Sequence, residues 1–314
     1  MKQLILHVGL HKTGTSSIQS FLMKNIEILK EQGTAVYTRK GKAGVHWVPA
    51  MIKNKQPHQV KMVADFVRSE LAKDDVNQVI ISSENFTQTK QANYPMITSL
   101  LPSNTQLVII IYLRRQDLLK QSVYSQMVKQ GTFSGTINED SHYNLDLYKQ
   151  CTKWKALTND IRVRVVERSQ LIEGDLLKDF VHTIGLKWNE KFEPLINQIN
   201  ESYCSDTMEF KRLLNAKKLP PAINKKVAAT LSQYDKERSD NEREKAVFFD
   251  YSEASSFLDG FHEGNSDIAR EFLGREDGLL FTEMPSEEQL KNIPKLSEKQ
   301  ILNFSAYLIK NLVS

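Results

Sequence analysis

A short loop between an apolar run and a helical pattern, close to the N-terminus, constrains this chain more than any other feature. Residues 4–8 are apolar apart from one histidine and predict a buried strand, and residues 17–22 predict a helix. The loop between them carries two glycines, a lysine and several hydroxyl side chains. A helix that begins behind such a loop directs its unpaired N-terminal amides and the positive end of its dipole toward the loop. The segment therefore predicts a site for a phosphate or sulfate group.

The position of the lysine separates two kinds of phosphate-binding loop. A Walker nucleotide loop ends in Gly-Lys-Ser/Thr, with its lysine after the second glycine. Here the lysine comes first, and the order of the residues is Lys12, Thr13, Gly14, Thr15, Ser16 and Ser17. This order resembles the 5′-phosphosulfate loop of sulfotransferases that use 3′-phosphoadenosine 5′-phosphosulfate. The resemblance implies that residues 12–17 hold the 5′-phosphosulfate of this donor and that Lys12 contacts its bridging oxygen.

A second motif lies where a long apolar run ends on two arginines. Residues 107–112 predict a central strand that is buried on both faces, and Arg114 and Arg115 follow it. Open parallel sheets bind ligands at the ends of their strands, and a guanidinium group matches the oxygens of a phosphate. In the same sulfotransferases, an arginine at this place and a serine eight residues later bind the 3′-phosphate of the donor. Arg114 and Ser122 have that spacing, so the resemblance assigns them this role.

Strand and helix patterns alternate over the first 190 residues. Further strands are expected at 34–37, 78–82 and 161–166, and helices at 60–71, 95–101, 116–129 and 145–157. This alternation predicts an α/β protein with a P-loop-like, three-layer αβα fold and a central, mostly parallel sheet. We expect one domain over residues 1–314, with the donor site in a core of residues 1–190 and a mainly helical part in residues 200–314.

Composition indicates the setting in which the protein works. The net charge of +4 suits an anionic donor or an acidic acceptor and does not require nucleic acid. Two cysteines, Cys151 and Cys204, are too few for a disulfide framework, which favours a reducing compartment. The apolar runs are shorter than a secretory leader or the roughly twenty residues of a membrane-spanning helix. We therefore expect a cytoplasmic protein without an integral membrane segment. The sequence implies no metal, and it leaves the oligomeric state open.

Sulfuryl transfer to a hydroxyl needs a base for the acceptor proton and a positive charge for the leaving phosphate. Lys12 is the candidate for the leaving group. Glu84, which follows the strand at 78–82, is the candidate base; carbohydrate-specific relatives use a glutamate, whereas cytosolic sulfotransferases carry a histidine near this place. His46, in the loop after residues 34–37, is the alternative base or an acceptor-binding residue. His11 is expected to pack against the loop or to cap it.

Together, these residues and the resemblance predict a sulfotransferase that moves a sulfuryl group from 3′-phosphoadenosine 5′-phosphosulfate to a hydroxyl acceptor. A sugar or polysaccharide is the expected acceptor, because of the glutamate and because residues 261–275 are similar to a segment near the end of carbohydrate sulfotransferases. A nucleotide-dependent P-loop kinase is one alternative, although Gly-Lys-Ser/Thr and an acidic strand residue are missing. A non-catalytic nucleotide-binding or polysaccharide-binding protein of the same fold is the other.

Overall fold

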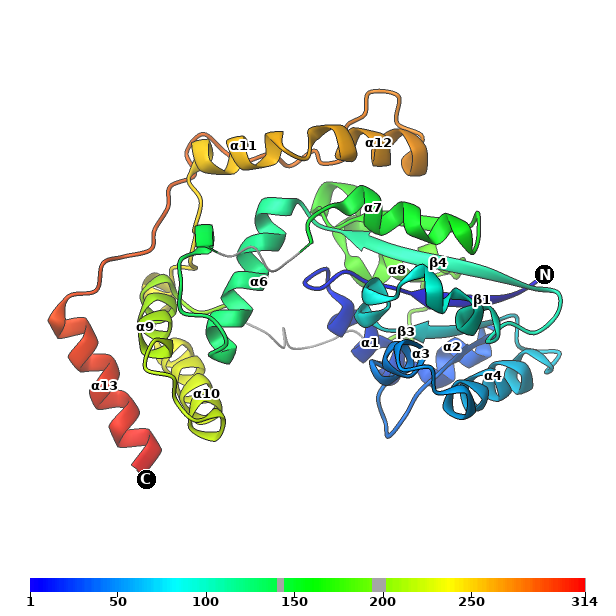
Figure 1. Cartoon of the computed structure of the whole chain (residues 1–314), viewed down its shortest axis with the longest axis horizontal. Coiled ribbons are helices and arrows are strands. Elements are labelled where there is room, and N and C mark those ends of the chain that lie inside the picture. Colours follow the sequence, from blue (N-terminus) through cyan, green and yellow to red (C-terminus); the bar gives the residue numbers. More distant parts are fainter. Residues whose placement is uncertain (140–143, 194–201, 314) are drawn as a thin grey trace. The chain divides into compact units, whose positions relative to one another are not determined.

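The computed structural model describes residues 1–139, 144–193 and 202–313. The chain divides into two compact units, whose elements are labelled in Figure 1. The first unit comprises residues 1–115, 146–197 and 262–283, and the second comprises residues 116–145, 198–261 and 284–314. Each unit therefore takes in segments that are far apart in the sequence.

A five-stranded sheet forms the centre of the first unit, and all its neighbouring strands are parallel. The strands lie in the order β2 (Thr34–Val36), β3 (Gln78–Ser82), β1 (Lys2–His7), β4 (Thr105–Leu113) and β5 (Ile161–Val165). Leu4, Ile5 and Leu6 are completely buried although they alternate between the two faces, so both faces of β1 are covered. The predicted α/β class with a central parallel sheet is confirmed.

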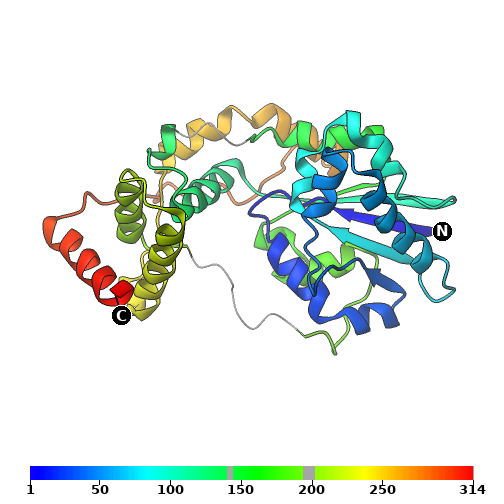
Figure 2. The same ribbon diagram turned by 60° about the horizontal axis from the view of Figure 1, so that its bottom comes forward.

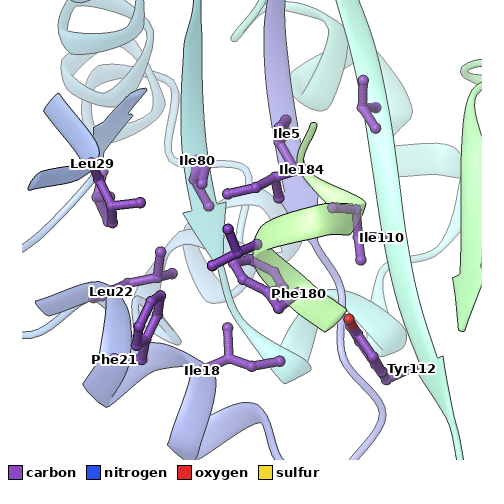
Figure 3. Close-up of a cluster of buried hydrophobic side chains, with 14 of the residues drawn as sticks. Ile5, Ile18, Phe21, Leu22, Leu29, Ile80, Ile110, Tyr112, Phe180 and Ile184 are labelled. Atoms are coloured by element: carbon purple, nitrogen blue, oxygen red, sulfur yellow. The ribbon is translucent and has the colours of Figure 1, made fainter. Parts of the chain in front are cut away.

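Helices flank this sheet and give the three-layer arrangement that the sequence predicts. The helices of the first unit are α1 (Thr15–Lys24), α2 (Ile26–Glu31), α3 (Trp47–Lys53), α4 (Pro57–Leu71), α5 (Tyr94–Thr98), α7 (Leu147–Thr152), α8 (Leu176–Thr183) and α12 (His262–Leu273). Figure 3 shows the core beneath α1 and α8, where Ile18, Phe21 and Phe180 are buried with Ile5 and Ile110 of the strands. Apolar burial of this kind holds α1 behind the end of β1.

The second unit consists of helices and their connections (Figure 2). Its helices are α6 (Gln116–Gln130), α9 (Ser205–Asn215), α10 (Pro221–Glu237), α11 (Tyr251–Asp259) and α13 (Glu298–Val313). Their buried residues form a separate core that includes Tyr124, Leu231 and Phe304. The helical character expected for the C-terminal part is present. In the described parts of the chain, no helix has the length and apolar character needed to cross a membrane.

A buried carboxylate, Asp179, fastens α8 to two strands. The Tyr112 hydroxyl on β4 donates to its Oδ1 at 2.7 Å, and Arg164 Nε on β5 donates to the same oxygen at 3.0 Å. The backbone N–H of Ile172 donates to Oδ2 at 3.2 Å. Asp179 is fully buried, and burial together with this carboxylate raises the pKa of Tyr112 above its ordinary value. Removing one member of such a group leaves uncompensated polar atoms in the interior.

The substitution Asp179→Ala is expected to lower the free energy of unfolding by roughly 3–5 kcal/mol, because Arg164 then loses the charge that compensates it. All three tryptophans lie in the first unit, so urea unfolding followed by tryptophan fluorescence reports on that unit. Asp65→Ala is the control, because Asp65 forms an exposed pair with Arg68 and its loss is expected to cost at most about 1 kcal/mol. Equal losses for the two variants would contradict the role assigned to Asp179.

Candidate functional site

The loop predicted to bind an anion connects β1 to α1 at the centre of the sheet. Lys12 and Gly14 both adopt positive φ, at 66° and 84°. Gly14 is the N-cap residue of α1, and no side chain of the described residues caps this helix end. The amides of the first turn therefore have neither an intrahelical acceptor nor a side-chain cap, which is the state of a helix N-terminus that can accept an anion.

Two glycines are required by close contacts within this loop. A Cβ atom on Gly9 would lie 2.3 Å from Oγ1 of Thr15, and a Cβ atom on Gly14 would lie 2.2 Å from Cδ2 of Leu176. Gly14 also has the left-handed conformation that residues with a side chain rarely adopt. A side chain at either position would therefore force Thr15 or Leu176 to shift.

The hydroxyl groups of the loop fall into two sets. Thr13 Oγ1 donates to the carbonyl oxygen of Leu10 at 2.7 Å, and Thr15 Oγ1 donates to the same oxygen at 3.4 Å. Both threonines are buried, whereas Ser16 is exposed and Ser17 is half-buried. In this structure the two threonine hydroxyls stabilise the loop itself, a use that the sequence pattern does not reveal.

The arginine predicted to bind phosphate lies at this loop. Nη1 of Arg114, directly after β4, donates to the backbone carbonyl of Lys12 at 3.2 Å. Arg115 is 5% exposed and donates to the carbonyl of Glu283, also in the first unit. Ser122, the expected partner of Arg114, lies half-buried on α6 in the second unit. The structure thus brings Arg114 into contact with the loop, whereas Ser122 belongs to the other unit.

Both candidate bases belong to one polar cluster at the end of β3. Glu84 begins the short helix η1 (Glu84–Gln88), and its side chain is 20% exposed. Its Oε2 lies 3.7 Å from Nδ1 of His46, and its Oε1 lies 4.0 Å from Nδ1 of His11. Nε2 of Gln19, on α1, donates to Oε2 at 3.5 Å. His11 therefore faces Glu84 rather than only packing within its own loop.

A layer of polar residues beneath this cluster was not identified from the sequence. His7 ends β1 opposite Ser82 of β3, and its Nδ1 lies 2.9 Å from the Ser82 hydroxyl. Gln19 Nε2 donates to the same hydroxyl at 3.3 Å, and Nδ1 of His46 lies 3.2 Å from the Ser83 hydroxyl. The sequence feature that could have indicated this layer is that both apolar strands end on a polar residue, His7 or Ser82.

Burial controls the protonation of two of the three histidines. It lowers the pKa of His7, which is completely buried, from 6.5 to about 3. It also lowers the pKa of His11, and this effect exceeds the opposing attraction of Glu84. Both rings are therefore neutral at pH 7, and an uncharged imidazole faces the Glu84 carboxylate. Over the described ranges, no cluster of three or more His, Cys, Asp or Glu side chains is arranged to hold a metal ion.

Comparison with known proteins adds one relative. No protein-family model matches the chain. An uncharacterized protein from Archaeoglobus fulgidus is 29% identical to it over 194 residues, which are 60% of this chain and 52% of the relative. The chain thus spans about half the length of the curated relative it matches, and that relative carries no functional description.

The low pKa of His7 predicts a specific loss of stability in acid. The unfolded chain binds a proton near pH 6.5, whereas folded His7 binds one only near pH 3, so stability falls as the pH drops below 6.5. Between pH 7 and about pH 5.5, the titration of His7 is expected to lower the free energy of unfolding by about 1 kcal/mol. Urea unfolding at both pH values measures the total loss, to which His11 also contributes, and His7→Gln should remove the part that is due to His7.

His58→Gln provides the matched control, because it makes the same substitution at an exposed histidine. If the free energy of unfolding falls equally in the unmodified protein and in His7→Gln as the pH is lowered, the prediction that folded His7 stays neutral is wrong.

Proposed function

We propose that this protein is a cytoplasmic sulfotransferase that transfers a sulfuryl group from 3′-phosphoadenosine 5′-phosphosulfate to a hydroxyl group of a carbohydrate. One observation carries the proposal: residues 12–17 form the end of the loop and the first turn of α1, and His11 of the same loop lies 4.0 Å from the Glu84 carboxylate. A loop for an anionic group and a carboxylate for proton removal thus occur together at one edge of the sheet.

Three features of the loop support binding of the donor. The uncapped N-terminus of α1 offers backbone amides to a 5′-phosphosulfate. Lys12 supplies a compact positive charge on a flexible side chain, which suits the bridging oxygen. Arg114 already contacts the Lys12 carbonyl and would add a planar guanidinium group for the 3′-phosphate. Ser122 remains the proposed second ligand of that phosphate.

The reaction balances with the groups present at the site. An acceptor oxygen forms a bond to sulfur while the bond from sulfur to the 5′-phosphate oxygen breaks, and the hydroxyl proton goes to the base. Lys12 stabilises the negative charge that develops on the departing phosphate. The protein otherwise contributes by positioning both substrates for the reaction, as in phosphoryl transfer.

We assign proton removal to Glu84 and a positioning role to His46. The carboxylate has a histidine nitrogen 3.7 or 4.0 Å from each of its oxygens and accepts a hydrogen bond from Gln19, so three side chains surround it. His46 is 46% exposed at its side chain and also lies 3.2 Å from the Ser83 hydroxyl, so it can hold Glu84 while facing solvent.

The first test of the donor site is thermal unfolding with 3′-phosphoadenosine 5′-phosphate. At about one hundred times its Kd, this product should stabilise the protein by roughly 2.7 kcal/mol and raise Tm by roughly 5–10 °C. Arg114→Ala should reduce the shift, whereas Arg68→Ala, on the exposed surface of α4, should not. Stabilisation by magnesium-ATP alone would indicate a kinase and overturn the proposal.

The second test measures turnover with labelled donor and a panel of sugar acceptors. Lys12→Ala is expected to lower kcat by about 10²–10³-fold, because a positioned charge at the leaving group is lost. Glu84→Gln should lower kcat by about 10²–10⁴-fold, as expected for loss of a general base, and His46→Asn should have a smaller effect.

Unchanged turnover in Lys12→Ala would contradict the assigned chemistry. A larger loss for His46→Asn than for Glu84→Gln would exchange the roles of the two residues. Circular dichroism of each variant separates these effects from loss of the fold.

A further inference from the structure

The stretch that leads to His46 has an unusual charge pattern. Residues 32–64 contain no aspartate or glutamate, although acidic residues make up 38 of the 314 residues of the chain. The same stretch contains six cations, all of which are exposed: Arg39, Lys40, Lys42, Lys53, Lys55 and Lys61. Within residues 1–139, 144–193 and 202–313, no carboxylate forms an ion pair with any of the six. Their charges are therefore available to an external anion.

Three of these cations lie on a tight hairpin whose backbone is well defined. Arg39 and Lys42 exchange backbone hydrogen bonds of 3.0 and 3.1 Å. Lys40 and Gly41 between them have positive φ values of 50° and 71°, as in the two-residue turns that suit hairpins. We call residues 39–42 the basic hairpin. Its turn presents Arg39, Lys40 and Lys42 together.

The basic hairpin is tied to the end of the strand that precedes Glu84. The N–H of Val45 donates to the carbonyl oxygen of Ser82 at 3.1 Å, and Gly44 pairs with Ser82 in a parallel bridge. His46 follows and lies 3.7 Å from Glu84. His46 is four positions after Lys42, so even an extended chain keeps their Cα atoms within about 14 Å. The hairpin charges thus lie within a few sugar units of the proposed base.

We propose that the acceptor is an acidic polysaccharide, whose carboxylate or sulfate groups bind the basic hairpin while one of its hydroxyls faces Glu84. This inference deepens the proposed function and rests on it. Exposed cations attract such a chain over a distance close to the Debye length, which is about 8–10 Å at moderate salt.

The aromatic residues near the hairpin favour a polysaccharide over a single-stranded nucleic acid. Nucleic-acid strands bind by stacking their bases on exposed aromatic rings. Tyr37 is 8% exposed, and the guanidinium of Arg39 lies 4.2 Å from the centre of the Trp47 ring. Trp47 therefore already stacks with Arg39 on one face, and Tyr37 packs against both Trp47 and Phe66.

The test is fluorescence anisotropy with a labelled heparin octasaccharide as probe, and with neutral dextran oligosaccharides of similar size for comparison. The full chain should bind the octasaccharide and not the dextran, and binding should weaken as salt is added. Replacing all three hairpin cations (Arg39→Gln, Lys40→Gln and Lys42→Gln) should weaken binding by about tenfold, as expected for the loss of three exposed ion pairs.

The matched control replaces three exposed lysines of the second unit, Lys217→Gln, Lys225→Gln and Lys226→Gln, and should bind like the unmodified protein. Equal weakening in both triple variants would show a response to net charge alone and overturn the proposal. Equally tight, hairpin-dependent binding of a single-stranded oligonucleotide would also overturn it, in favour of nucleic acid.

The same variants separate this inference from the proposed function. The hairpin variant should keep its thermal shift with 3′-phosphoadenosine 5′-phosphate, because the hairpin is not part of the donor loop. With an acidic acceptor, it should raise KM more than it lowers kcat. Hairpin-dependent octasaccharide binding without any shift by the nucleotide would instead reject the donor site and with it the sulfotransferase proposal.

Discussion

The position of β1 between β3 and β4 is the constraint on which the candidate site depends. His7, the last residue of β1, lies opposite Ser82 of β3 and Ile110 of β4. Because the three strands are parallel, the segments that follow them leave the sheet at the same edge. The loop, Glu84 and Arg114 therefore meet although they are distant in sequence. The burial of apolar strand residues, rather than attraction among the polar ones, sets this arrangement.

The conformation of the loop is fixed by several independent contacts. Gly9 approaches Thr15, the hydroxyl of Thr13 bonds to the Leu10 carbonyl, and Arg114 bonds to the Lys12 carbonyl. A loop ordered in this way loses little further conformational entropy when a ligand binds. Since two hydroxyls are engaged inside the loop, recognition of an anion there would depend on backbone amides and charge more than on threonine side chains.

The sequence was sufficient to predict the apolar strands and the residues that directly follow them. Residues 78–82 and 107–112 are predicted as strands because of the apolar runs at 79–81 and 107–112, and Arg114 is predicted at the binding edge because it follows such a strand. His7 was missed because its partner Ser82 is 75 residues away, and a polar residue inside an apolar run gives no sign of its partner. The spacing of Arg114 and Ser122 could not show that α6 belongs to another compact unit, because packing between helices decides that.

The charges around the site also bear on how the two anions of the proposed reaction would approach each other. A phosphosulfate donor and an acidic acceptor repel one another, so neither can approach unless nearby cations offset both charges. Lys12 and Arg114 lie on the loop side of Glu84, and the basic hairpin joins it from the His46 side. Exposed charges act only over about a Debye length, so these cations must be close to Glu84 to have this effect. The absence of acidic residues from positions 32–64 removes the local groups that would otherwise neutralise the hairpin. In the proposed reaction, the Glu84 carboxylate beside these cations would be the group that accepts the proton.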